Sequence, residues 1–571
     1  RSTARCLIRN LSINPVTMTK YKHKASSTPP RKTVKKETLP GHAEVVEWVI
    51  LGLILAFIAF IRIRLSSFPL ERDEGEYAYF GQLILDGFPP YKLAYNLKFP
   101  GTYYCYAFSM AVFGQSIQGI RMGLLLFDLG TLVFLFLATK KLFNAFTGLI
   151  AVMTCGLLIT GPSLLGQAAH ATHFVTFFMM AGTWCLLLAL EKEKWLWFLC
   201  SGLLMGLAFI MKQSGIFFSL FGGAVIIAAR ALHWKKNLKT SIAGLLLYIL
   251  GVCIPVVLML ILMKTSSVFE KFWFWTITYP GEYGSRIPLA KAGSMFLSLF
   301  PMVTKTYTVF WILAGLGFLG LFIPGQKPWN RLFVILFLLA SFLPTVPGFY
   351  FRNHYFVPLL PAIGMLTGIF FDSINRILET RFRPVRYLTA VAFIMVVITQ
   401  LSARKDYLFT ESPADLCRYT YRGNLFAESV EISRYIEDHS SPDEKIFVFG
   451  SEPQIFFYSH RWSATGYIYM YDLSFDQRYR KQMQNELETE VETNAPKYII
   501  YCSSPSSWNI SGGVTDTLFQ WFNKYLTENK FIVVGYADYR FPGPTTYIWD
   551  AEALRYRPQS QIYMAVLRRS E

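Results

Sequence analysis

Residues 45–64 read VVEWVILGLILAFIAFIRIR, and a few residues later the chain turns abruptly charged in LERDEGEY at 70–77. An apolar run of about 20 residues is long enough to cross a bilayer as a helix. Similar runs recur along a chain that is 53% hydrophobic and only 16% charged, with a mean hydropathy of +0.34. This composition excludes an ordinary soluble protein and predicts a polytopic membrane protein.

We expect about eleven membrane helices from the apolar runs. They lie near residues 45–64, 122–139, 145–162, 174–190, 195–211, 215–230, 241–263, 303–324, 332–348, 356–372 and 387–402. An odd number of spans places the N-terminus and everything after residue 402 on opposite sides of the membrane.

The net charge of +18 is explained by where the basic residues lie. Lys and Arg gather in the tail and in loops that all face one side if each apolar run is one helix. These loops lie near residues 20–36, 140–141, 191–194, 230–239, 327–331 and 375–386. The positive-inside rule makes that side the cytoplasm, so no nucleic-acid partner is needed to explain the charge.

The domain organisation follows from this topology. Residues 1–44 are predicted to form a basic, disordered cytoplasmic tail, and residues 45–402 the transmembrane domain. Two long loops, 65–121 and 264–300, are expected on the outer side. Residues 403–571 have the composition of a soluble domain, in which helical and strand-like stretches alternate, and this predicts a small exoplasmic α/β domain. Its two cysteines, Cys417 and Cys502, would be either bonded or free.

The charged stretch after the first helix is the main candidate for chemistry. Glu71, Asp73, Glu74 and Glu76 stand within about one turn of one another, and mutual repulsion would raise the pKa of one of them, as proton removal requires. Lys98 returns in the same loop, and a second cation follows near residue 352. Acids and cations on one face suit a reaction at a phosphate-linked leaving group. The alternative is a solvated surface loop.

The pattern Asp73-Glu74, Lys98-Phe99-Pro100 and Tyr103-Tyr104 resembles the GT-C class of integral-membrane glycosyltransferases. The nearest families are the aminoarabinose transferases and protein O-mannosyltransferases, including bacterial enzymes that modify lipopolysaccharide. KQSG from Lys212 and HYFVPLLPA from His354 also look like segments of that class, and the resemblance covers about residues 45–400. It implies transfer of a sugar from an undecaprenyl- or dolichyl-phosphate carrier, with inversion at the anomeric carbon.

The resemblance also implies roles for single residues. Asp73 would deprotonate or orient the acceptor, and Glu74 would assist it or hold a metal. The carrier phosphate would be bound by a set of basic residues, namely Lys98, Arg352, Lys212 and His354. Lys212 would alternatively be a cation at the membrane interface. The cofactor is unknown, and the sequence does not require a divalent metal.

Two histidines stand where relatives often carry an acid, at the outer end of the fourth apolar run. His170 and His173 in GQAAHATHF would contact the sugar, serve as ligands or simply pack as polar residues. Tyr103 is a further candidate for substrate binding. Asp128 lies within an apolar run, where a charge is costly, and would hydrogen-bond a neighbouring helix or serve a function.

These observations predict a glycosyltransferase of the cell inner membrane whose active site and C-terminal domain face the periplasm. Its expected partners are a polyprenyl-phosphate-linked sugar, membrane lipids and an acceptor that is lipid A, another glycan or a protein. The alternative from another class is a membrane transporter or lipid flippase, although the chain has no convincing internal repeat. A scaffold that binds glycolipid without reaction is a third interpretation.

Overall fold

The computed structural model describes residues 41–232, 238–378, 384–508 and 516–570. Residues Glu47–Glu571 form one compact unit. The predicted disordered tail, apart from its last residues, lies outside the described part of the chain.

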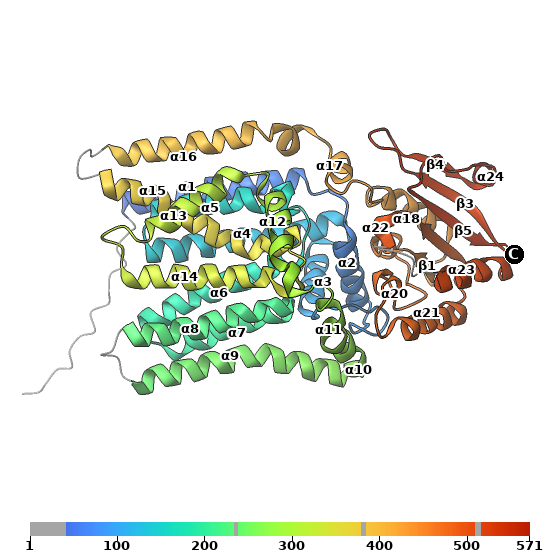
Figure 1. Cartoon of the computed structure of the whole chain (residues 1–571), viewed down its shortest axis with the longest axis horizontal. Helices are drawn as coiled ribbons and strands as arrows, with labels where there is room; N and C mark the ends of the chain where they lie inside the picture. Colours follow the sequence, from blue (N-terminus) through green and yellow to red (C-terminus); the bar gives the residue numbers. More distant parts are fainter. Residues whose placement is uncertain (1–40, 233–237, 379–383, 509–515, 571) are drawn as a thin grey trace, which may run out of the picture. The chain divides into compact units, whose positions relative to one another are not determined.

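A bundle of long apolar helices accounts for the predicted membrane domain (Figure 1). Its helices are α1 (His42–Arg64), α4 (Ile117–Leu142), α5 (Ala145–Ile159), α6 (Ala171–Lys192), α7 (Trp195–Met211), α8 (Ile216–Leu232), α9 (Leu238–Thr265), α12 (Leu289–Thr304), α13 (Thr308–Gly320), α14 (Pro328–Phe342), α15 (Leu360–Leu378) and α16 (Val385–Ser402). Each of the eleven predicted runs contains a helix.

Not all of these helices have the length of a membrane span. Among the described residues, seven are long and apolar enough, and the pair α12 and α13, bent by 114°, would make an eighth. The helices α5 and α7 and the segment 386–402 are apolar but shorter. The chain is therefore an integral membrane protein, while the number eleven stays a prediction. The expected long loop 264–300 stays a prediction; α12 begins inside it, and a hydropathy run does not show the bend between α12 and α13.

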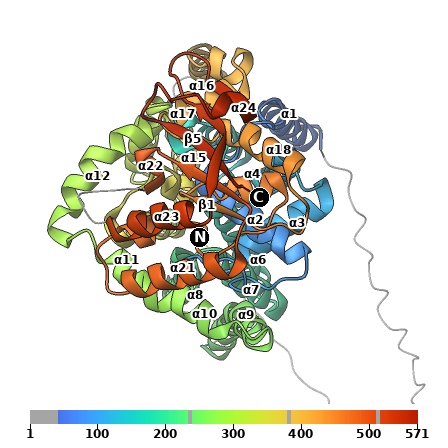
Figure 2. The same cartoon turned by 90° about the vertical axis from the view of Figure 1, so that its right-hand side faces the viewer.

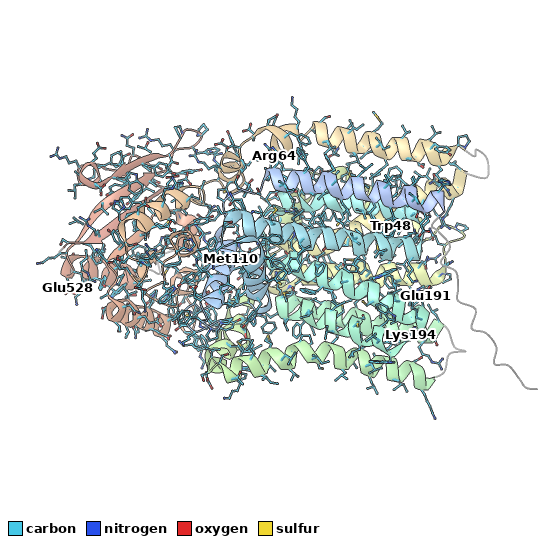
Figure 3. The ribbon with its side chains drawn as sticks, turned by 180° about the vertical axis from the view of Figure 1, so that it is seen from behind. Trp48, Arg64, Met110, Glu191, Lys194 and Glu528 are labelled. Atoms are coloured by element: carbon cyan, nitrogen blue, oxygen red, sulfur yellow. The ribbon has the colours of Figure 1, made fainter. Side chains whose placement is uncertain are left out.

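Two of the basic loops, 140–141 and 191–194, lie together at one end of the bundle, near the start of α1. Lys140 Nζ is 2.6 Å from Glu47, near the start of α1, and Lys141 Nζ is 2.6 Å from Glu191 at the end of α6. Figure 3 shows Trp48, Glu191 and Lys194 at this end, with Arg64 towards the other. These two loops thus share one end of the bundle, and the side of the membrane that they face stays a prediction.

The first long loop, which the sequence predicts on the outer side, contains two helices, α2 (Arg72–Leu85) and α3 (Gly101–Phe113). The charged stretch is the first turn of α2. Glu71 caps this helix by accepting from the backbone N–H of Glu74 at 3.0 Å, while the Glu74 side chain accepts from the backbone N–H of Glu71 at 3.3 Å. Such a reciprocal cap fixes the start of a helix and places acids where its dipole stabilises them.

Short helices α10 (Phe269–Trp273) and α11 (Tyr279–Gly284) occupy the second outer loop, joined by a π-helical turn at Phe274–Thr278. After α16 the chain enters the C-terminal domain, whose elements face the viewer in Figure 2. Its helices are α17 (Pro413–Thr420), α18 (Glu428–His439), α19 (Gln454–Ser459), α20 (Tyr471–Ser474), α21 (Arg480–Asn494), α22 (Pro505–Trp508), α23 (Asp516–Glu528) and α24 (Asp550–Ala553).

The C-terminal domain contains a mixed five-stranded sheet, so the predicted α/β domain is confirmed. The strands are β1 (Ile446–Phe449), β2 (Tyr498–Cys502), β3 (Phe531–Asp538), β4 (Thr546–Trp549) and β5 (Tyr563–Arg569). Their order is β1-β2-β5-β3-β4, with β1 and β2 parallel and the other pairs antiparallel. Cys417 and Cys502 are both buried and free, which settles the open question about a bond between them.

Candidate functional site

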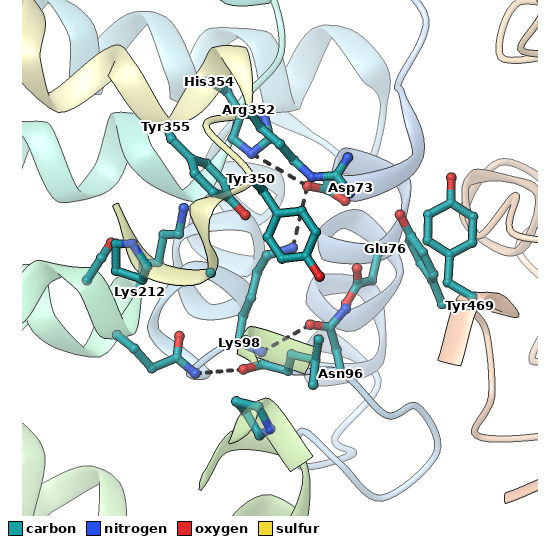
Figure 4. Close-up of a pocket in the computed structure, with 18 of the residues that line it drawn as sticks. Asp73, Glu76, Asn96, Lys98, Lys212, Tyr350, Arg352, His354, Tyr355 and Tyr469 are labelled. Carbon is teal, nitrogen blue, oxygen red and sulfur yellow. Dashed lines mark hydrogen bonds and ion pairs between the residues drawn. The ribbon is translucent and has the colours of Figure 1, made fainter. Parts of the chain in front are cut away.

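A cavity of about 260 Å³ lies where three parts of the chain meet (Figure 4). The loop around α2 contributes acids and a lysine, the outer ends of bundle helices contribute further cations, and the C-terminal domain contributes tyrosines and an acid. Its lining includes Asp73, Glu76, Asn96, Lys98, Lys212, Tyr350, Arg352, His354, Tyr469, Tyr471 and Asp472. The site thus combines most of the predicted residues with several from the far end of the chain.

Asp73 lies beside a lysine that the loop holds in place. Lys98 Nζ is 3.5 Å from Asp73 Oδ2 and stands over the ring of Tyr77, 4.6 Å from its centre. The backbone carbonyl of Lys98 accepts from the hydroxyl of Tyr91 at 2.5 Å and lies 3.5 Å from that of Tyr103. Tyr103 is itself fully buried and therefore supports the Lys98 segment from behind instead of lining the cavity.

Two histidines complete the surroundings of Asp73. The rings of His170 and His354 are stacked with centres 3.9 Å apart, and each has a nitrogen 4.0 Å from Asp73 Oδ2. Neither ring nitrogen of the buried His170 has a hydrogen-bond partner within the described residues. The nearest ligand atoms of the three side chains lie within 4.8 Å of one another. Two imidazoles and a carboxylate suit zinc or another first-row divalent metal, so the residues fit such an ion.

The charges around the cavity set the ionisation of its groups. Burial disfavours the ionised form of Asp73, but the positive charges around it, Lys98 first, outweigh this effect and lower its pKa to about 2. Burial and the charge of Lys98 lower the pKa of Lys212 to about 7. Burial and the negative charge of Asp73 raise the pKa of Glu71. Two acids of the charged stretch, Glu71 and Glu76, thus have a raised pKa, whereas Asp73 stays ionised.

Glu74 is not brought into the cavity. Its side chain is buried and forms an ion pair with Arg121 on α4, with Arg121 Nη2 3.0 Å from Glu74 Oε2. Its other oxygen accepts from the backbone N–H of Ala169 at 2.5 Å. Both oxygens are therefore used in anchoring α2 to the bundle. The catalytic or metal-binding role of Glu74 stays a prediction, and these contacts favour an anchoring role.

His173 also lies away from the cavity. Its Nδ1 is 2.9 Å from Asp128 Oδ1, and Asp128 pairs in turn with Arg62 at the end of α1. These contacts account for Asp128, the buried acid on α4. It contacts neighbouring helices, which is one of the two interpretations that the sequence left open. Arg62 also donates to the backbone oxygens of Gly166 and Ile159, and so holds the segment that leads to His170.

Sequence reasoning missed the residues that close the cavity from the far side. Tyr469, Tyr471 and Asp472 belong to the C-terminal domain, and no pattern in the sequence links them to residue 73. Glu76 was part of the charged stretch but received no role. A helical period would have identified it, because residues three apart on a helix share a face.

Comparisons with known proteins agree with this geometry. Residues 98–278 match the family described as dolichyl-phosphate-mannose-protein mannosyltransferase, which is less than half of the chain. No curated protein sequence matches the chain.

Solved structures match most of its length. ArnT from Cupriavidus metallidurans, bound to undecaprenyl phosphate, is 14% identical with a TM-score of 0.55, covering 92% of this chain and 98% of that one. The oligosaccharyltransferase AglB from Archaeoglobus fulgidus, in complex with an inhibitory peptide and a dolichol-phosphate, is 10% identical with a TM-score of 0.51, covering 89% and 75%. An Archaeoglobus fulgidus oligosaccharyltransferase with Zn and sulfate is 13% identical with a TM-score of 0.51, covering 86% and 72%. The chain shares the fold of these proteins, and the predicted resemblance to GT-C glycosyltransferases is confirmed at that level.

Proposed function

We propose that the protein transfers a sugar from a polyprenyl-phosphate carrier to an acceptor on the outer face of the membrane. One observation carries this proposal: an ionised carboxylate, Asp73, faces a cavity lined by three cations, Lys98, Lys212 and Arg352. Cations of this kind bind a phosphate and stabilise the charge that a phosphate leaving group acquires. The family match and the two neighbours solved with polyprenyl phosphates support the same donor class.

The reaction is a single displacement. An acceptor hydroxyl attacks the anomeric carbon of the donor sugar, a new carbon–oxygen bond forms, and the bond from that carbon to the phosphate oxygen breaks. The electron pair leaves with the carrier phosphate, and the proton of the hydroxyl passes to Asp73. Because attack comes from the side opposite the leaving group, the anomeric configuration inverts. The acceptor is a lipid, a glycan or a protein.

A pKa of about 2 makes Asp73 a weak base in the protein alone. The cations that depress this pKa are also those that a carrier phosphate would neutralise. Binding of the donor therefore raises the pKa of Asp73 towards its ordinary value, because the phosphate charge offsets that of Lys98 and its neighbours. Asp73 becomes a competent proton acceptor only when the leaving group is in place.

Asp73, His170 and His354 would hold a divalent metal if the enzyme uses one. When bound, such an ion would supply positive charge to the departing phosphate. Among the structural neighbours, one oligosaccharyltransferase was solved with Zn.

The orientation proposed for the whole protein places the basic loops in the cytoplasm and this cavity on the periplasmic side.

The test compares wild type with Asp73→Asn, a change that keeps the side-chain shape. Purified protein in lipid nanodiscs receives undecaprenyl-phosphate sugars labelled in the sugar, with a membrane extract as acceptor. We expect transfer by wild type and a loss of about 10²- to 10⁴-fold in the variant, with carrier binding retained. The matched control is Asp86→Asn at the exposed end of α2.

Two results would contradict the proposal. The first is equal transfer by wild type and Asp73→Asn. The second is movement of the intact carrier across vesicle membranes without any transfer of the label, which would instead identify a lipid flippase.

A further inference from the structure

Glu76 is the most unusual polar residue in the cavity. Its side chain is fully buried, and neither carboxyl oxygen has a hydrogen-bond partner within the described residues, although the residue lines the cavity. A buried polar group without a partner costs free energy, so such groups in native proteins are nearly always satisfied by something. The neighbouring side chains do not satisfy Glu76, so its carboxyl is available to a ligand that enters the cavity.

The position of Glu76 shows which part of a ligand it would meet. It lies three residues after Asp73 on α2 and therefore on the same face of the helix. In the view of Figure 4, Glu76 lies on the side of the cavity away from Lys212, and Asn96 and Tyr469 line the same cavity. A donor with its phosphate among the cations and its anomeric carbon at Asp73 would extend its sugar ring towards this side.

A second acid approaches from the C-terminal domain. Asp472 lines the same cavity, and its Oδ1 accepts from the hydroxyl of Tyr279 at 2.8 Å. That hydroxyl in turn accepts from Arg286 Nη2 at 3.3 Å, so the second outer loop holds the carboxyl in place. Tyr469 and Tyr471 line the same cavity. Carboxyls with adjacent aromatic rings bind sugars well, because the acids bond hydroxyls and the rings cover the apolar faces.

The ionisation of both acids suits hydroxyl ligands. Burial raises the pKa of Glu76. The positive charge of Lys98 opposes this effect, and the negative charges of neighbouring acids add to it. Burial raises the pKa of Asp472 to about 6. A carboxylate accepts hydrogen bonds from sugar hydroxyls, and a carboxyl that holds its proton both accepts and donates them, so either form of these acids can bond a hydroxyl.

We propose that Glu76, together with Asp472, forms a specificity-determining subsite that binds the hydroxyl groups of the sugar carried by the donor. This inference rests on the proposed function and adds to it the part of the substrate that the acids recognise. The cations hold the phosphate, and the acids distinguish one sugar from another.

The experiment measures the affinity of the full-length protein in nanodiscs for two probes. One is undecaprenyl phosphate, and the other is the same carrier linked to a hexose; a panel of epimeric hexoses identifies the preferred one. For Glu76→Leu we expect the affinity for the hexose-linked carrier to fall by about 10- to 100-fold. The affinity for undecaprenyl phosphate should change less than about twofold. Glu76→Gln, which again donates and accepts, should recover most of the loss.

Asp472→Asn tests the second acid in the same way, and Asp86→Asn outside the cavity is the matched control. Equal loss for both probes would overturn the inference, because it would mean general damage to the cavity. No loss for either probe in Glu76→Leu would also overturn it. If wild type binds neither carrier, the proposed function itself fails, and the two failures are thus distinguished.

Discussion

The contact between α2 and α19 is close enough that one methyl group should disturb it. Gly75 lies in the first turns of α2 and faces the start of α19. A Cβ added there would lie 2.5 Å from the backbone N of Gln454, 2.5 Å from its Cβ and 2.7 Å from its Cα. Favourable contacts between carbon atoms occur at roughly 3.5–4.0 Å, so Gly75→Ala forces the two helices about 1 Å apart.

The cost follows from what surrounds this contact. The obstructing atoms belong mostly to backbone, and the buried pair of Arg72 with Glu452 holds the same junction, so the helices cannot separate freely. Overpacking of this kind costs about 1–3 kcal/mol, while alanine in a helix regains about 1 kcal/mol over glycine. We expect a small net loss of stability. Asp472 and the tyrosines also shift relative to Asp73, and a misplacement of about 1 Å costs on the order of 10²-fold in rate.

The assay is the sugar-transfer rate together with thermal unfolding in nanodiscs. Gly52→Ala in α1 and Gly315→Ala in α13 are the controls, because an added Cβ has no neighbour within 4 Å at either position. Both controls should keep full activity and equal or higher stability. If Gly75→Ala behaves like them, the packing argument for the junction is wrong.

Two further predictions concern charge. The affinity for an undecaprenyl-phosphate sugar should fall as pH rises from 6 to 8, because Lys212 with a pKa of about 7 loses its proton while the phosphodiester keeps its charge. Binding titrations of Lys212→Arg should give an affinity that does not change over this pH range, because arginine keeps its charge. If the affinity of Lys212→Arg falls with pH as steeply as that of wild type, Lys212 is not the group that titrates. Arg121→Met should lower the free energy of unfolding by about 3–5 kcal/mol, because it leaves the charge of Glu74 buried without its partner. The double variant Arg121→Met with Glu74→Leu should recover most of this loss in unfolding experiments. A single variant Arg121→Met as stable as wild type would contradict the prediction.

The fold was largely predictable because its signals are local. Each apolar run contains a helix, and helices and strands alternate within residues 403–571 as the sequence predicted. The bend between α12 and α13 was not predictable, since composition does not report direction. Nor was the contribution of Tyr469 and Asp472 to the cavity, because contacts across some 400 residues depend on how whole elements pack.

The charged stretch shows how much of the site the helical periodicity could have predicted. Successive residues of an α-helix are about 100° apart, so Asp73 and Glu76 are separated by about 60° and Glu74 lies about 100° from Asp73 on the other side. The structure agrees with these angles: Asp73 and Glu76 line the cavity, whereas Glu74 forms an ion pair with Arg121 in the bundle. Treated as a loop, the four acids were indistinguishable. Treated as a helix, they separate into acids that face the substrate and an acid that holds the helix, and we expect substitutions to separate in the same way, into losses of activity and losses of stability.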